Sequence, residues 1–133
     1  MAVTPNLGIT HVNATDADKP AVVNAALQLF DDAFCESLTI DLSATSPFTS
    51  SLTLTAAEEN QNLVLILTGA LSSNFTITLT GNARFLIIIN QTVSSPAINL
   101  IFTVGSGSQT VSISDLAAHV LYSDGAAKVY KVS

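Results

Sequence analysis

The chain has 133 residues, of which 48% are hydrophobic and only 11% are charged, below the share of about 25% charged residues in typical soluble domains. Four basic residues against ten acidic ones give a net charge of −6, and the basic residues form no cluster. Because nucleic acids and anionic membrane surfaces are bound by clustered Lys and Arg, we expect neither as a partner. The length suits one domain with a single core.

No stretch of the sequence is typical of a membrane span, a secretory signal or a disulfide framework. The longest apolar runs, residues 63–67 and 85–89, are far shorter than the ~20 residues that cross a bilayer, and we interpret them as strands buried on both faces. The N-terminal sequence lacks the basic and apolar regions of a signal peptide. Cys35 has no partner for an intrachain disulfide, and we expect it to be a small buried side chain. The chain is therefore expected to fold in a reducing cytoplasm.

Residues 1–17 contain turn-forming residues but no sustained period, which predicts an extended arm. Its apolar side chains are candidates for contact with a neighbouring surface. These arm residues are Val3, Leu7, Ile9 and Val12. The arm either covers its own domain or reaches a partner, and the sequence favours neither.

One helix is predicted from Pro20 to about Phe34, with Asp18 as the N-cap and a proline in the first turn, where no hydrogen bond is lost. Its apolar residues fall on two adjoining stripes at helical spacing. One stripe is Val23, Leu27, Phe30 and Phe34; the other is Val22, Ala26, Leu29 and Ala33. A helix that covers only its own sheet needs one stripe, whereas a second stripe suits contact between copies. We therefore expect an oligomer interface at Val23, Leu27, Phe30 and Phe34; the alternative is a helix packed in its own core.

The rest of the chain predicts eight or nine short strands. Phe75, Ile77 and Leu79 alternate with threonines, which predicts one buried and one exposed face. An Asp-Gly turn between two apolar-polar runs predicts a closing hairpin in which Tyr122 and Tyr130 pair.

This pattern predicts a mainly β fold: an antiparallel, jelly-roll-like β-sandwich with an N-terminal extended arm and one α-helix. A β-solenoid is the alternative, but the chain shows no fixed repeat period. We expect two parts, an arm and amphipathic helix at residues 1–36 and a β-sandwich module at residues 37–133.

No catalytic, metal or cofactor site is predicted, and we do not expect an enzyme. His11 lies in the arm and His119 in an apolar strand, where a histidine is usually a hydrogen-bonded structural residue. The Gly/Ser loop at residues 105–108 lacks the lysine of a phosphate-binding loop. The acidic pairs at residues 31–32 and 58–59 lack the spaced ligands of a calcium loop, so we expect solvated carboxylates.

Several phrases resemble a module of tailed-bacteriophage virion proteins. The β region reads LTGALSSNFTITLTG from Leu67, FLIIINQT from Phe85, a Gly/Ser loop, and VLYSDGAAKVYKV from Val120. This order of phrases resembles tail-fibre, tail-adaptor and head-decoration chains. The segment TPNLGITHVNATDADKPAVVNAALQLFDDAF, residues 4–34, is similar to the head segment of phage and prophage tail proteins, where an arm and a helix precede the β region.

The resemblance implies a non-enzymatic structural protein of the virion, assembled in the host cytoplasm. The favoured role is a capsid decoration or cement protein, a homotrimer that binds the major capsid protein and stabilises the shell. The alternative is a tail-fibre or tail-adaptor protein that binds a tail protein; it is less favoured because the chain stops at Ser133 with no shaft or distal tip. A carbohydrate-binding β-sandwich is a further alternative, disfavoured because the chain has no Trp for an aromatic platform.

Overall fold

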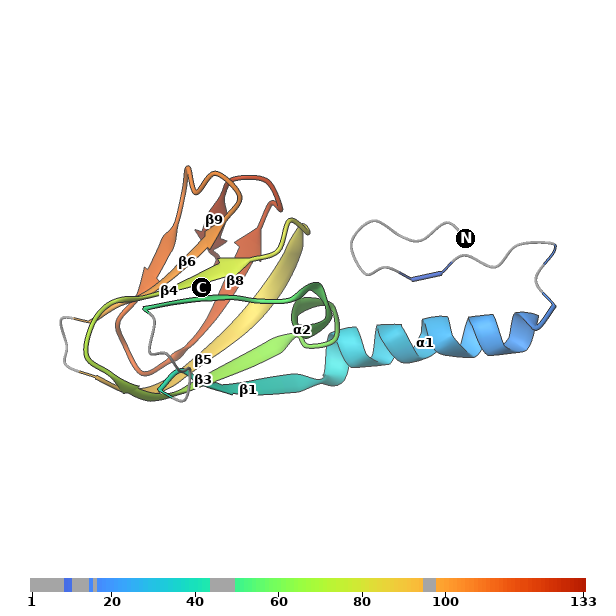
Figure 1. Cartoon of the computed structure of the whole chain (residues 1–133), viewed down its shortest axis with the longest axis horizontal. Coiled ribbons are helices and arrows are strands. Elements are labelled where there is room, and N and C mark those ends of the chain that lie inside the picture. The colour runs from blue at the N-terminus through green and yellow to red at the C-terminus, as the bar shows by residue number, and fades with distance from the viewer. Residues whose placement is uncertain (1–8, 11–14, 16, 44–49, 95–97) are drawn as a thin grey trace.

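The computed structural model describes residues 9–10, 15, 17–43, 50–94 and 98–133. Figure 1 shows a body of two β-sheets from which one long helix projects, with the first strand continuing from the end of that helix. The elements in chain order are α1 (Lys19–Cys35), β1 (Ser37–Asp41), β2 (Ser51–Thr53), α2 (Ala56–Asn60), β3 (Val64–Leu71), β4 (Phe75–Leu79), β5 (Arg84–Ser94), β6 (Leu100–Val104), β7 (Val111–Ile113), β8 (Ala118–Ser123) and β9 (Val129–Lys131).

Helix α1 begins and ends where its sequence signals place the boundaries. The Asp18 carboxylate accepts a hydrogen bond from the backbone N–H of Ala21 at 3.1 Å, which satisfies one of the unpaired donors of the first turn. At the other end, Glu36 has an extended backbone and its N–H binds the Asp32 carbonyl. The chain therefore passes from helix directly into β1, and the predicted helix and its N-cap are confirmed.

The expectation of a single helix is wrong, because a second helix, α2, precedes β3. Thr55 and Glu58 form a reciprocal capping box: the Thr55 hydroxyl accepts the Glu58 N–H at 3.2 Å, and the Glu58 carboxylate accepts the Thr55 N–H at 2.8 Å. This pair satisfies two backbone donors at once. With only five residues in α2, there is no apolar periodicity long enough to predict it.

The fold is mainly β, but its strands are not all antiparallel as predicted. The five-stranded sheet has the order β1-β3-β5-β8-β9 and the four-stranded sheet the order β2-β4-β6-β7. Strands β1, β3 and β5 are parallel neighbours, as are β2, β4 and β6. The first six strands thus alternate between the two sheets, and their path is not that of an antiparallel jelly roll.

Parallel neighbours need a long crossover connection, and here each crossover contains a strand of the other sheet. In the four-stranded sheet both intervals are 25 residues, from Ser51 to Thr76 and from Phe75 to Leu100. The corresponding steps in the other sheet, Ser37 to Val64 and Val64 to Ile87, are unequal. Because these steps are unequal and no side-chain motif is repeated, the regular alternation of the strands between the two sheets cannot be recognised from the sequence.

Each of the last three strands, β7, β8 and β9, pairs antiparallel with a neighbouring strand. The two sheets come together at this end of the body. The predicted hairpin is confirmed: β8 pairs with β9, and Tyr122 lies opposite Tyr130. The loop after β6 lies close to the loop after β8, since a side chain at Gly105, whose φ is +53°, would lie 1.8 Å from the Ala126 carbonyl oxygen. Only glycine fits this approach.

One hydrophobic core lies between the sheets and contains side chains from both. Its largest fully buried members include Phe75 and Phe102 from the four-stranded sheet and Leu65, Leu86 and Leu121 from the other. Strands β4 and β6 alternate strictly between buried and half-buried residues, so the predicted inward set of Phe75, Ile77 and Leu79 is confirmed. None of the core residues comes from α1.

Candidate interaction surfaces

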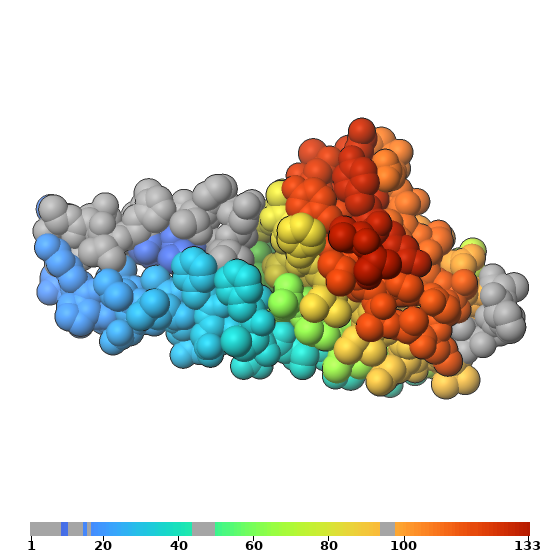
Figure 2. All heavy atoms as spheres, turned by 180° about the vertical axis from the view of Figure 1, so that it is seen from behind, coloured from blue at the N-terminus to red at the C-terminus, as the bar shows by residue number. Residues whose placement is uncertain are grey.

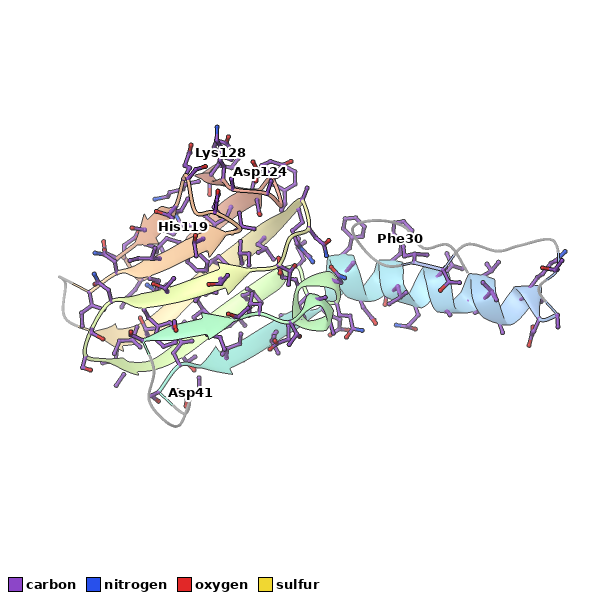
Figure 3. The ribbon with its side chains drawn as sticks, turned by 45° about the horizontal axis from the view of Figure 1, so that its top comes forward. Phe30, Asp41, His119, Asp124 and Lys128 are labelled. Carbon is purple, nitrogen blue, oxygen red and sulfur yellow. The ribbon has the colours of Figure 1, made fainter. Side chains whose placement is uncertain are left out.

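The stripe on α1 that we predict to be an oligomer interface is open to solvent in the single chain. Its side chains remain 43% (Val23), 61% (Leu27), 49% (Phe30) and 63% (Phe34) exposed. The rings of Phe30 and Phe34 stack with their centroids 6.1 Å apart. Figure 3 shows Phe30 on the part of α1 that extends beyond the sheets. The alternative, a helix packed in its own core, is wrong for this stripe.

The adjoining stripe of α1 is more enclosed. Val22, Ala26 and Leu29 are half-buried, and Ala33 is buried. A hollow on this side of the helix is lined by Thr10 together with Ala21, Val22 and Ala25. Thr10 of the arm therefore lies beside the enclosed side of α1, and the two stripes differ in environment as well as in position.

Of the predicted arm residues, only Ile9 lies within the described part of the chain, where it is 7% exposed. Val3, Leu7 and Val12 fall outside the described residues.

The outward face of the five-stranded sheet is a second apolar surface, which the sequence analysis did not predict. We call it the outer apolar face. Its residues lie on β3, β5, β8 and β9, including the position just after β9, and alternate with buried core residues. They are Val64, Ile66, Phe85, Ile87, Ile89, Val120, Tyr122, Tyr130 and Val132. The continuous apolar runs at residues 63–67 and 85–89 contain this signal, but the expectation that these strands are buried on both faces is wrong for their outward residues.

The outward face of the four-stranded sheet has the opposite character. Its positions on β2, β4, β6 and β7 are Ser51, Thr53, Thr76, Thr78, Ile101, Thr103 and Ser112. Hydroxyl side chains suit a strand face in contact with water, as expected when only one side of a sheet covers a core. The two sheets therefore share one core but present different outer surfaces.

Three aromatic rings stand in a row on the outer apolar face. Phe85 pairs with Tyr122, with ring centroids 5.0 Å apart, and Tyr122 stacks on Tyr130 at 6.3 Å. These cross-strand contacts are favourable for aromatic residues in sheets. Tyr122 therefore packs between Phe85 and Tyr130, which remain 55% and 38% exposed.

The pair formed by His119 and Asp115 connects β8 to neighbouring segments. His119 Nε2 lies 2.8 Å from Asp115 Oδ1, and Nδ1 lies 3.2 Å from the Ser133 carbonyl oxygen. Hydrogen bonding to His119 is the main cause that lowers the pKa of Asp115. His119 is 8% exposed and has the structural hydrogen bonds expected of a strand histidine.

The prediction that both acidic pairs are solvated is wrong at Glu59, which is fully buried. One carboxylate oxygen accepts the backbone N–H of Thr80, while Oε1 has no hydrogen-bond partner among the residues that the structure describes. Burial raises the pKa of Glu59, opposed by the hydrogen bonds from Thr80 and the nearby charge of Arg84. The capping box holds the Glu58 carboxylate at the start of α2. The side chain of the next residue, Glu59, therefore points into the protein.

Cys35 is exposed, which corrects the expectation of a buried side chain. It ends α1, outside the core. Within the described ranges, no group of three or more His, Cys, Asp or Glu residues is placed to hold a metal ion. Across the same residues, no helix combines the length and apolar character needed to cross a membrane.

Comparisons of the chain with protein-family models, with curated proteins and with solved structures find no match.

Proposed function

We propose that this chain is a non-enzymatic structural subunit of a bacteriophage particle that associates with itself through α1. The observation that carries the proposal is the exposed stripe of Val23, Leu27, Phe30 and Phe34 on a helix that projects from the β body. Large apolar side chains left in water on one side of a helix favour burial against another helix.

The spacing of the stripe supports packing between helices of different copies, and the resemblance to head-decoration chains adds the expectation of a homotrimer. Val23, Leu27, Phe30 and Phe34 step by four, three and four residues, the alternation of a coiled-coil seam. The exposed stripe has no charged side chain, so copies meet there without repulsion. In this proposal three α1 helices pack together along the stripe, and each carries a β-sandwich module at its C-terminal end.

The particular role we propose is that of a capsid decoration or cement protein located on the virion. The sequence phrases that resemble head-decoration and tail proteins of tailed phages support this context. The Ser/Thr face of the four-stranded sheet suits an outward, hydrated surface, and the low charge of the chain suits a subunit held within an assembly. The major capsid protein is the proposed partner, because binding to an assembled shell stabilises that shell.

Co-sedimentation of the purified full chain with phage shells and, separately, with phage tails tests this role. The proposal predicts that the chain sediments with shells and raises their melting temperature. Sedimentation with tails alone would instead indicate the tail-adaptor role. Binding to neither particle would contradict a virion protein.

A further inference from the structure

The outer apolar face is a surface whose composition does not suit exposure to water. Residues 64–67 of β3 and 86–89 of β5 are apolar at every position, a pattern typical of strands covered on both sides. In this chain the inward residues Leu65 and Leu86 are buried, but the outward residues Val64 and Ile87 are only half-buried. Figure 2 shows the molecule from the side opposite to Figure 1. In this sheet β3, β5, β8 and β9 follow one another.

The face is continuous across four strands because its residues are in register. Val64 lies opposite Ile87, and Ile87 lies opposite Val120. The Val132 N–H binds the Val120 carbonyl at 2.8 Å, which extends the row to the end of the sheet. Contiguous apolar patches of this kind on soluble proteins mark sites of association.

The length of α1 argues that a second copy of this chain covers the face. Coiled-coil seams that hold helices together on their own are sustained over three to four heptads or more, roughly 21 to 28 residues. Helix α1 has 17 residues and only four large side chains in its exposed stripe. Stable interfaces bury roughly 1,200 to 2,000 Å², so copies joined along α1 need additional contact area.

The connection between α1 and the five-stranded sheet places the outer apolar face close to the proposed α1 contact. Glu36 alone separates the end of α1 from β1, and β1 is an edge strand of the same sheet. Copies that pack along α1 therefore hold these sheets next to one another. The outward positions of β3, β5, β8 and β9 contain no charged side chain, whereas those of the edge strand β1 are Ser37, Thr39 and Asp41. The uncharged part of the face is therefore the part that suits contact with a copy of a chain whose net charge is −6.

We propose that, in the oligomer, the outer apolar face of each copy is covered by the β-module of a neighbouring copy. This inference rests on the proposed self-association through α1. It adds a second, larger contact that involves Ile87, Val120 and the aromatic row.

The test compares the same isoleucine-to-threonine substitution on the outward face of each of the two sheets. Ile87→Thr changes the outer apolar face, and Ile101→Thr makes the same change at a half-buried outward position of β6, on the hydroxyl-rich face. Sedimentation velocity over a range of concentrations measures association, and circular dichroism checks folding. We expect Ile87→Thr to weaken association at least tenfold, while Ile101→Thr associates like the unchanged chain.

Leu27→Asp on α1 separates this inference from the proposed function. If Leu27→Asp dissociates the oligomer but Ile87→Thr does not, the sheet contact is overturned and the α1 contact stands. If Ile87→Thr weakens association and Leu27→Asp does not, the sheet contact stands and the α1 contact is overturned. An unchanged chain that is monomeric at every concentration overturns both.

Cysteine labelling keeps the test independent of any loss of stability. In a Cys35→Ser background, Val120→Cys places a thiol on the outer apolar face and Ile101→Cys places one on the other sheet. Maleimide labelling of Val120→Cys is expected to slow as concentration rises, while Ile101→Cys reacts at a constant rate. Concentration-independent labelling at Val120→Cys would overturn a contact between copies.

Discussion

Phe30 and Phe34 stack on one side of α1 with ring centroids 6.1 Å apart, yet 49% and 63% of these side chains remain exposed. A stacked pair shields only part of each ring from water, so much of their apolar area stays available to a partner. The pair lies on the same stripe as Val23 and Leu27. It supports the interpretation of α1 as a contact between copies.

Charged substitutions on this stripe are expected to prevent association without unfolding the chain. In the proposed oligomer, the new carboxylate of Leu27→Asp or Phe30→Asp would be buried without a partner, which is costly. In the single chain both side chains are largely exposed, so the β body is expected to keep its melting temperature. Light scattering is expected to give a monomer for both variants, and Asn24→Asp, at an exposed polar position of α1, serves as the control. A folded trimer of unchanged mass from Leu27→Asp would contradict the interface.

The arm is expected to contribute to attachment rather than to folding of the β body. Deletion of residues 1–13 removes the buried Ile9 and Thr10, which lies beside α1, but no residue of the core cluster between the sheets. We expect weaker co-sedimentation with phage shells and an unchanged β signal in circular dichroism. Incorporation into particles at the level of the full chain would show that the arm is not an anchor.

Glu59 is expected to make stability fall as pH rises. Its pKa is raised above the ordinary value of 4.5, mainly by burial, so the folded chain holds this proton more tightly than the unfolded chain. Well below pH 4.5, Glu59 is protonated in both the folded and the unfolded chain and does not lower the free energy of unfolding. As pH rises through the raised pKa, ionisation of the buried carboxyl group lowers the free energy of unfolding. Glu59→Gln keeps an acceptor for the Thr80 N–H and removes the charge.

Denaturant unfolding at several pH values checks this effect. We expect Glu59→Gln to be at least as stable as the unchanged chain at pH 7, with a flatter dependence on pH above 4.5. Glu59→Ala, which leaves the Thr80 N–H unpaired, is expected to lose about 1 to 3 kcal/mol. An unchanged pH slope in Glu59→Gln would contradict the role given to the buried carboxylate.

Asp124 is expected to have the opposite effect on pH dependence. Its Oδ1 accepts backbone N–H bonds from Ala127, Lys128 and Ala126 at 2.9, 3.0 and 2.9 Å, and these bonds lower its pKa below the ordinary value of 3.8. The stabilisation is therefore present above pH 3.8 and is lost as pH falls through the lowered pKa.

Asp124→Ala is expected to melt at a lower temperature at pH 7, with a difference from the unchanged chain that shrinks in acid. Asp124→Asn keeps the acceptor oxygen and is expected to retain most of the stability at pH 7. Thermal melts of the two variants between pH 2 and pH 7 check both expectations. Equal melting temperatures for Asp124→Ala and the unchanged chain at pH 7 would contradict the role of this turn.

Local signals predicted much of the secondary structure. The N-cap at Asp18, the alternation around Ile77 and the Asp-Gly turn before β9 all depend on residues close together in sequence, and each is observed. Period-two alternation tells which side chains point inward. It does not tell which strand is the neighbour or in which direction that strand runs, so the parallel pairing of β1 with β3 was missed.

The candidate surfaces were predicted in part for a similar reason. The α1 stripe follows from helical spacing alone, and the structure adds that the stripe is exposed. Prediction of the outer apolar face requires the strand register, which places Ile87 beside Val64 and Val120. The sequence alone also does not tell which carboxylate of the pair Glu58 and Glu59 is solvated. The capping box holds Glu58 at the helix start, and Glu59 is buried in the protein.

The molar mass of the full chain, measured by light scattering from low to high concentration, tests self-association most directly. We predict a trimer of the 13.8 kDa chain that dissociates on dilution. A mass of one chain at every concentration would contradict both the α1 contact and the contact at the outer apolar face.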